Sequence, residues 1–179
     1  MNNFIYDTPT KVYFGKDEEL KIGKIISEYH PSKVLIHFGG ASARKSGLLE
    51  RVENCLKEEN ISFVELGGVV ANPELSLVRE GIALGKREGV DFVLAVGGGS
   101  VLDSSKAIAN PDVDVWDFSL GKAAPARTLP KGAILTLAAA GSEMSSSCVI
   151  TNAATGEKRG YNSSFNRMNF AIENPVLTY

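Results

Sequence analysis

Apolar residues along this chain follow two patterns that alternate. Continuous apolar runs, typical of strands buried on both faces, occur at Lys33–Phe38, Ile61–Leu66, Phe92–Val96 and Ala133–Leu137. Other segments space their apolar residues three or four positions apart, as amphipathic helices do. These segments are Asp17–Tyr29, Leu48–Leu56, Leu75–Ile82 and Val101–Ala109. The alternation predicts an α/β fold with a doubly wound parallel sheet.

Weaker strand-type runs flank this alternating region. Phe4–Tyr6 and Lys11–Phe14 are expected to form a strand pair at a sheet edge. Asp112–Phe118 is expected to form a short surface helix. Three further runs, with Thr155-Gly156 as a hairpin turn, predict a small β meander near the C-terminus. They are Cys148–Asn152, Lys158–Tyr161 and Asn169–Ile172.

The stretch from Gly97 to Lys106 has the pattern of a strand, a glycine turn and a helix. Ser100 is expected to be the N-cap of the helix, with Asp103 at capping-box spacing. The glycines let backbone N–H groups approach a bulky anion at the positive end of the helix. A phosphate or pyrophosphate site is therefore predicted here, with a plain tight β–α connection as an equally weighted alternative.

A second glycine turn, Gly39-Gly40-Ala41-Ser42, follows an earlier strand. It is not a P-loop, because Arg44 occupies the position of the second required glycine. Both turns are expected at the carboxyl edge of the sheet, where such folds bind ligands. Two glycine turns on one edge favour a dinucleotide over a single phosphate. A third motif, Asn72-Pro73-Glu74, predicts an N-cap followed by proline at the first helical position.

Composition limits the remaining possibilities. The 179 residues, 44% of them apolar, suffice for one large domain spanning 1–179. The net charge of −2, without a basic cluster, makes nucleic acid and anionic membranes unexpected partners. No apolar run has bilayer length, and Met1–Asp7 lacks the features of a signal peptide. Cys55 and Cys148 form no metal-type pair, so we expect reduced thiols and a cytoplasmic location.

Catalytic and metal-ligating residues are not predicted from the residues themselves. His30 precedes a proline at a helix end, and His37 lies within a buried strand, so both are expected to be structural. No carboxylate–histidine cluster and no Ser/His/Asp set is evident.

Four blocks give the chain a family resemblance. Gly-Gly-Gly-Ser-x-x-Asp-x-x-Lys at 97–106 resembles the signature of the iron-containing (group III) alcohol dehydrogenase family. Thr136–Glu143, Phe14-Gly15 and Asn174-Pro175-x-Leu177-Thr178 also resemble segments of that family. The resemblance covers essentially the whole chain and is strongest to the butanol dehydrogenase-like branch.

The resemblance implies a Rossmann-like, dehydroquinate synthase-like N-terminal domain and a homodimer formed through the N-terminal strand region. It also implies NAD(P)-dependent interconversion of small primary alcohols and aldehydes by hydride transfer. The family's divalent metal, iron or zinc, is held by one Asp and three His on a helical C-terminal domain. We expect that domain to be absent from these residues, and the chain to be inactive without it.

The resemblance also implies a set of cofactor-binding residues. Gly98, Gly99 and Ser100 would hold the pyrophosphate, and Asp103 would lie near the nicotinamide. Further positions would line the groove (Thr136, Leu137), reach the cofactor ribose (Lys158) and pack near the adenine (Leu177). Taken alone, Lys158 is equally well a solvated hairpin lysine. Ala138, Ala140 and Ser145 replace Pro, Thr and Asn of relatives, which removes polar contacts.

The turn after the first core strand bears on cofactor preference. Family members that prefer NAD tend to carry an aspartate there, which binds the adenosine ribose hydroxyls. This chain instead has Gly39, Gly40 and Ser42, with Lys45 nearby. An uncharged, donor-rich turn tolerates a 2′-phosphate, so NADP is expected in preference to NAD.

Two other interpretations stay open. One is a nucleotide-binding or regulatory module without catalytic function, which the altered Ala138, Ala140 and Ser145 favour. The other is an enzyme of the glycerol or dehydroquinate branch on the same fold, which the Thr136–Glu143 block opposes.

Overall fold

A six-stranded sheet forms the centre of the molecule. The computed structural model describes residue 3 and residues 7–178. Its strand order is β1-β8-β5-β4-β2-β3, and all neighbouring strands are parallel. The strands are β1 (Lys11–Phe14), β2 (Val34–Phe38), β3 (Phe63–Leu66), β4 (Phe92–Gly97), β5 (Lys131–Leu135) and β8 (Phe170–Glu173). The predicted doubly wound α/β fold is confirmed.

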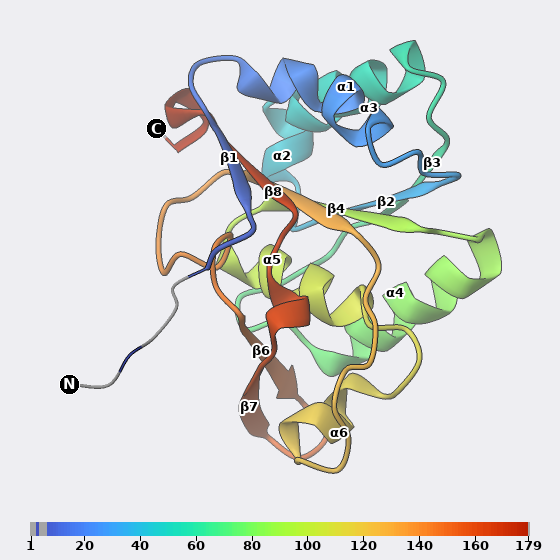
Figure 1. Ribbon diagram of the computed structural model, residues 1–179, viewed down its shortest axis with the longest axis vertical. Coiled ribbons are helices and arrows are strands. Elements are labelled where there is room, and N and C mark those ends of the chain that lie inside the picture. Colours follow the sequence, from blue (N-terminus) through green and yellow to red (C-terminus); the bar gives the residue numbers. More distant parts are fainter. Residues whose placement is uncertain (1–2, 4–6, 179) are drawn as a thin grey trace.

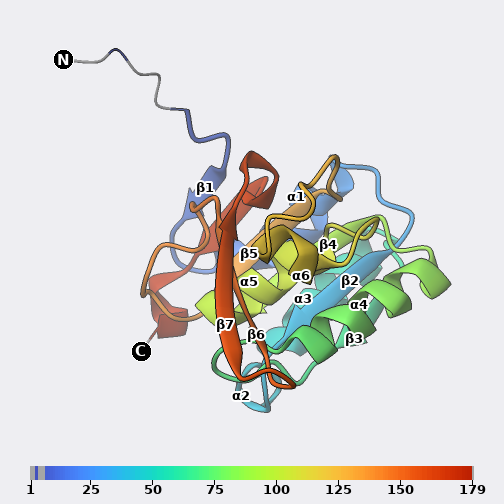
Figure 2. The same ribbon diagram turned by 90° about the horizontal axis from the view of Figure 1, so that it is seen from below.

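Helices cover both faces of this sheet (Figures 1 and 2). On one side lie α1 (Ile22–Ser27), α2 (Ser42–Lys45) and α3 (Leu48–Glu58); on the other lie α4 (Leu75–Glu88) and α5 (Gly99–Ile108). Side chains alternate along the strands, so Ile36 packs in the cluster that contains Leu49 of α3, while Leu35 packs with Val78 of α4. Burial on both faces explains why the central strands are continuously apolar.

The strand order changes direction between β2 and β4. The chain runs outward from β2 to β3, and then returns to β4 on the opposite side of β2. The carboxyl ends of these two neighbouring strands therefore diverge into different loops, which is where open α/β sheets bind ligands. Both predicted glycine turns begin at this point.

The C-terminal third differs from the predicted meander. β6 (Ser147–Asn152) and β7 (Glu157–Asn162) do form an antiparallel hairpin, which packs near α6 (Val115–Ser119). The run predicted at Asn169–Ile172, however, is β8, which lies within the main sheet between β1 and β5. The predicted hairpin is confirmed, but the assignment of Asn169–Ile172 to the meander was wrong, because pairing with strands distant in sequence, and not the local pattern, decides which sheet a short run joins.

Strand β1 and the two ends of helix α4 can also be compared with the elements expected from the sequence. β1 is an edge strand, as predicted, but its expected partner Phe4–Tyr6 lies outside the described residues. Helix α4 begins at Leu75 with Glu74 as the N-cap, so Asn72 is not the cap that was predicted. Asn72 has φ +59°, and this left-handed residue turns the chain before the helix. Gly89 ends α4 in the left-handed conformation that glycine adopts readily.

Short 3-10 turns at Glu18–Lys21, Ser164–Asn166 and Pro175–Thr178 complete the described structure. Within residues 3 and 7–178, no helix combines the length and apolar character needed to cross a bilayer.

Candidate functional site

A groove of about 470 Å³ lies at the carboxyl ends of β2 and β4, and we call it the carboxyl-end groove. It is lined by Gly39, Ser42, Ala43, Ser46, Leu48, Arg51, Val96, Gly97, Gly98, Val101, Thr136, Val176 and Leu177. The structure thus brings together five residues singled out in the sequence from four separate segments. These five are Gly39, Ser42, Gly98, Thr136 and Leu177.

Helix α5 opens toward this groove. Gly98 is its N-cap, with extended backbone (φ −90°, ψ −172°), and no side chain caps the first backbone N–H groups. Ser100 lies inside the first turn, so the predicted N-cap and capping box were wrong. The Asp103 carboxylate instead accepts hydrogen bonds from Ser142 Oγ at 2.7 Å and from the Val149 backbone N–H at 3.1 Å. The first turn of α5 is therefore free to donate to an external anion.

The glycines around the groove differ in what requires them. A Cβ on Gly97 would lie 2.5 Å from Val101 Cγ2, so close packing of α5 on β4 demands this glycine. A Cβ on Gly98 or Gly39 would make only ordinary contacts, at 3.4 Å to Leu137 and 3.5 Å to the Val69 carbonyl oxygen. The fold itself does not demand glycine at positions 98 and 39. Their missing side chains leave room for a bulky group, and this opening fits a diphosphate.

A buried polar network holds the wall of the groove behind α5. The Lys106 side chain is fully buried, and its Nζ donates to Ser142 Oγ at 2.8 Å and to the Ser147 carbonyl at 2.7 Å. Its Nζ also lies 3.4 Å from Asp103 Oδ1. Burial lowers the pKa of Lys106, and the Asp103 carboxylate partly opposes this effect. The network attaches the segment after β5 to α5.

Six of the residues that the sequence singled out do not line the groove. They are Gly40, Gly99, Ser100, Asp103, Leu137 and Lys158. Gly99 and Ser100 begin α5, and Leu137 lies beside Gly98 with its side chain 58% exposed. Lys158 lies on the hairpin, where its Nζ donates to Asn72 Oδ1 at 2.7 Å. The cofactor roles of these residues stay predictions.

Two polar residues of the groove were missed in the sequence. Ser46 and Arg51 line it, yet both lie outside the glycine turns, and Arg51 comes from within α3. No local motif identifies Arg51; only its place on the helix that follows the second turn could have suggested it. It is also the single charged side chain among the described lining residues.

The two histidines differ in their surroundings, and only the His37 side chain has hydrogen-bond partners within the fold among the contacts of the described residues. His37 Nδ1 lies 2.7 Å from the Leu66 carbonyl oxygen and Nε2 lies 2.8 Å from Ser104 Oγ, which fits a neutral ring with the proton on Nδ1. Burial lowers the pKa of His37 to about 4. His30 has φ +50° and is exposed. Among the described residues, no group of three or more His, Cys, Asp or Glu side chains could hold a metal ion.

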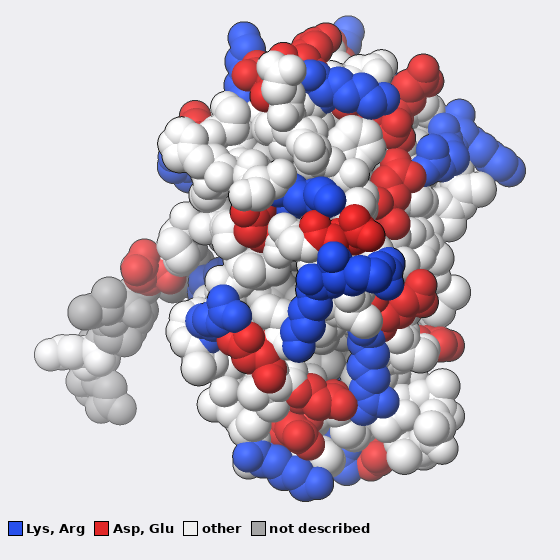
Figure 3. Space-filling model, turned by 90° about the vertical axis from the view of Figure 1, so that its right-hand side faces the viewer, with Lys and Arg blue, Asp and Glu red and all other residues white. Residues whose placement is uncertain are grey.

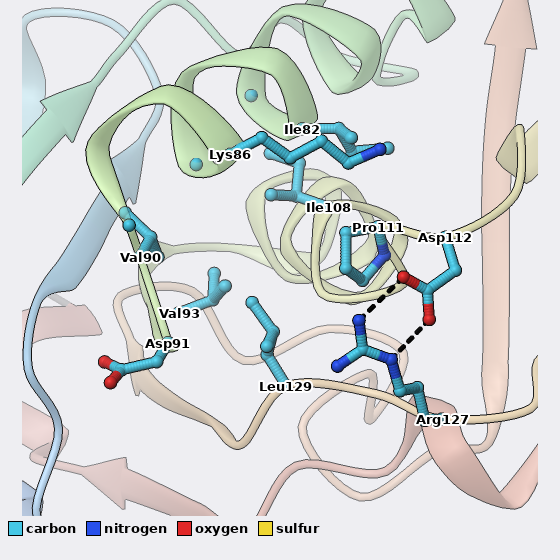
Figure 4. A pocket seen from close by; sticks show the side chains of 13 residues that line it. Ile82, Lys86, Val90, Asp91, Val93, Ile108, Pro111, Asp112, Arg127 and Leu129 are labelled. Atoms are coloured by element: carbon cyan, nitrogen blue, oxygen red, sulfur yellow. Dashed lines mark hydrogen bonds and ion pairs between the residues drawn. The ribbon is translucent and has the colours of Figure 1, made fainter.

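A second hollow, of about 340 Å³, lies at the opposite edge of the sheet (Figure 4). This amino-end pocket is lined by Gly81, Ile82, Gly85, Lys86, Gly89, Val90, Asp91, Val93, Ile108, Pro111, Asp112, Arg127 and Leu129. Arg127 and Asp112 form a two-point ion pair at its rim (Figure 4). On the α4 side of the molecule, acidic and basic side chains are interspersed (Figure 3), so that face offers no single-sign field for a polyanion.

Known proteins resemble this chain over its full length. A family model described as "Iron-containing alcohol dehydrogenase" matches residues 9–175. A probable NADH-dependent butanol dehydrogenase of Bacillus subtilis is 44% identical and matches 100% of this chain and 47% of its own length. An NADPH-dependent aldehyde reductase of Escherichia coli is 37% identical, again over 100% of this chain and 47% of its own.

The solved structures agree. The crystal structure of NADH-dependent butanol dehydrogenase A from Thermotoga maritima superposes with a TM-score of 0.96 at 41% identity, over 99% of this chain and 46% of that one. The chain thus spans about half the length of the curated relatives it matches. The family model covers nearly all of the described residues, and the glycine turns recognised in the sequence lie at the expected edge of the expected fold. The chain belongs to the iron-containing alcohol dehydrogenase family.

Proposed function

We propose that the carboxyl-end groove binds a nicotinamide dinucleotide and that the chain is the cofactor-binding part of a butanol-type alcohol dehydrogenase. One observation carries this proposal. The uncapped N-terminus of α5 opens into a groove at the switch point of the sheet, beside glycines that the fold does not itself require. NADH and NADPH both occur in the names of the relatives, so the names do not choose between the two cofactors.

The proposed binding mode follows from the positions of the residues. The backbone N–H groups at Gly98, Gly99 and Ser100 donate to the pyrophosphate. The adenosine extends toward the end of β2 and the Gly39–Ser42 turn, with Leu177 packing near the adenine. Thr136, Leu137 and Asp103 lie toward the nicotinamide, and Lys158 approaches the ribose. The bound dinucleotide would supply or accept the hydride when an aldehyde is reduced or a primary alcohol is oxidised.

The metal, the catalytic step and the dimer are proposed from the family to which the chain belongs. Among the described residues, no group of three or more His, Cys, Asp or Glu side chains could hold iron or zinc. We propose that the chain by itself binds the cofactor without turnover. We also propose a homodimer that forms along β1, one of the two edge strands, on which Phe14 is 69% exposed.

Calorimetric titration of the chain with NADH and NADPH at fixed salt tests this function. Saturable binding of either cofactor is expected. Gly98→Val should weaken binding at least a hundredfold, which is about 3 kcal/mol, because its side chain would occupy the diphosphate position. The extended backbone at position 98 admits valine, so the variant should fold, with its thermal midpoint lowered by only a few degrees because valine is a poorer N-cap than glycine.

Gly85→Ala is the matched control, because it adds a Cβ to a glycine in α4, remote from the groove and 3.7 Å from Val90. It should leave cofactor affinity unchanged. If the wild-type chain binds neither cofactor, or if Gly98→Val binds as tightly as the wild type, the proposed site is wrong.

A nucleotide-binding module without catalytic function is the second candidate. It is favoured by Ala138 and Ala140, which are exposed where relatives carry polar or rigid residues. Sequencing the coding DNA downstream of residue 179 separates the two candidates. An in-frame continuation that supplies Asp and His ligands supports the dehydrogenase, and a continuation without them supports the module.

A further inference from the structure

Three basic side chains lie close to the end of β2, and only one of them enters the carboxyl-end groove. Arg44 and Lys45 belong to α2, directly after the glycine turn, and neither lines the groove. Arg51 belongs to the first turns of α3 and does line it. The charge available to a ligand in the groove therefore comes from Arg51 and not from the basic residues that are nearest in sequence to the turn.

Arg44 is already engaged elsewhere. Its Nη2 donates to Glu65 Oε2 at 2.6 Å, its Nη1 lies 3.7 Å from Glu53 Oε1, and its guanidinium lies over the Phe38 ring. Two carboxylates neutralise this cation, which directs it away from an incoming anion. Lys45 is exposed and lies outside the groove.

Arg51 keeps donors to spare. Its Nη2 lies 3.5 Å from Glu19 Oε1 and its Nη1 lies 3.3 Å from the Ser46 carbonyl oxygen, and both contacts are long. A guanidinium has five N–H donors in a planar fork that matches a phosphate. The side chain is 38% exposed, so a ligand in the groove can reach these donors.

The neighbours of Arg51 favour an anion at the same place. The described lining residues include no acidic side chain, and Gly39 stands where an aspartate would repel a phosphate. The hydroxyl-bearing residues Ser42 and Ser46 line the groove together with Arg51. In dinucleotide-binding sheets, an arginine near the position of the ribose-binding acidic residue accommodates the 2′-phosphate of NADP.

We propose that Arg51, assisted by Ser42 and Ser46, binds the 2′-phosphate of NADP and so determines which dinucleotide the groove selects. This inference rests on the proposed function, because it assigns the adenosine end of that same site. Gly39 only removes a carboxylate that would repel the 2′-phosphate, whereas Arg51 supplies a cation that attracts it.

A purely structural role for Arg51 makes different predictions. The Glu19 side chain is only 3% exposed, and its Oε2 accepts a hydrogen bond from Asn174 Nδ2 at 2.8 Å, so Arg51 also offsets a buried negative charge. If this were the only role, Arg51→Gln and Glu19→Gln would change nucleotide binding in the same direction. If Arg51 binds phosphate, Glu19→Gln would free it from its carboxylate and would retain or increase the affinity for phosphate.

Calorimetric titration with two probes tests the proposal. Adenosine 2′,5′-bisphosphate carries the 2′-phosphate, and 5′-AMP lacks only that group. The wild-type chain is expected to bind the bisphosphate about tenfold more tightly, as one charge-assisted contact allows. Arg51→Gln should abolish this difference and leave 5′-AMP affinity unchanged. Arg44→Gln, the matched control for charge, should preserve the difference.

Each further outcome decides one claim. If the wild-type chain binds 5′-AMP but does not prefer the bisphosphate, Arg51 is not the phosphate-binding residue, while the proposed function stands. If neither the two nucleotides nor NADH and NADPH bind, the proposed function fails together with this inference. Should Arg51→Gln fail to fold, Arg51→Lys retains the charge opposite Glu19 but not the planar fork. It should lose part of the preference, and an undiminished preference would overturn the role of Arg51.

Discussion

The carboxyl-end groove and the amino-end pocket lie at opposite edges of one sheet, and both are lined by glycines. In the amino-end pocket, Gly81 and Gly89 serve the fold, whereas Gly85 has room for a Cβ. A Cβ on Gly81 would lie 2.5 Å from Ile108 Cδ1, and Gly89 ends α4 with φ +71°. In the carboxyl-end groove, Gly98 and Gly39 have neither constraint. A glycine that the fold does not require indicates a ligand only where, as at Gly98, it also lies at the uncapped N-terminus of a helix.

The two hollows also differ in their electrostatics. The groove faces the N-terminus of α5, whose partial charge is positive, and contains the loosely held Arg51. The pocket lies against the C-terminal ends of α4 and α5, and its Arg127 is paired with Asp112 (Figure 4). Cavity volume alone does not separate these hollows. The direction of the helix and the state of the charged side chains do.

Lowering the pH should destabilise the carboxyl edge through His37, which connects β2 with β3 and α5. The folded state keeps this imidazole neutral down to about pH 4, whereas the unfolded chain protonates it near pH 6.5. The stability that the neutral ring contributes is complete above pH 6.5 and is lost as the pH falls toward 4. The loss amounts to about 3 kcal/mol.

Urea unfolding at several pH values measures this loss. The variant His37→Gln lacks the buried imidazole, so its stability should fall less steeply between pH 6 and 5, by about 1.4 kcal/mol per pH unit. His30→Gln, at an exposed histidine, is the control and should follow the wild type. Equal slopes for wild type and His37→Gln would show that the imidazole is not the responsible group.

Gly81→Ala should destabilise the protein and leave cofactor binding intact, the reverse of Gly98→Val. The added methyl group would collide with the buried Ile108 side chain, and we expect a loss of about 1–2 kcal/mol in the free energy of unfolding. Gly85→Ala, on the same face of α4, has room for its Cβ and should gain up to about 1 kcal/mol from helix propensity. Thermal denaturation distinguishes the two, and equal midpoints would refute the packing role of Gly81.

Arg127→Gln should have the smallest consequence of these changes. The ion pair with Asp112 is exposed to solvent, where screening leaves such pairs little net contribution. We expect an unchanged thermal midpoint and unchanged affinity for NADH and NADPH. A loss of cofactor affinity would mean that the amino-end pocket is coupled to the carboxyl-end groove. It would contradict the assignment of cofactor binding to the groove alone.

Local pattern in the sequence predicted much of the fold. The continuous apolar runs correspond to β2, β3, β4 and β5, and the helical spacing corresponds to α3, α4 and α5. These segments are long or strongly patterned, so burial on one or both faces leaves a periodic signal. The glycine turn after β4 was predicted for the same local reason.

Three features depended on partners distant in the chain. β8 belongs to the main sheet because β1 and β5 flank it. Asp103 does not cap α5, because its carboxylate accepts hydrogen bonds from Ser142 and Val149. Arg51 became a groove residue because α3 packs beside the end of β2. None of these contacts leaves a trace in the residues next to the position concerned.

The sequence by itself therefore determined the class of fold, the family and the two glycine turns, since these follow from hydrophobic periodicity and from motifs within a few residues. Only the tertiary structure decided which glycines are not required by packing, which charged side chain lines the groove and which short strand completes the sheet. The physical reason is that packing, hydrogen bonding and burial are set by residues tens of positions apart, which meet only when the chain has folded.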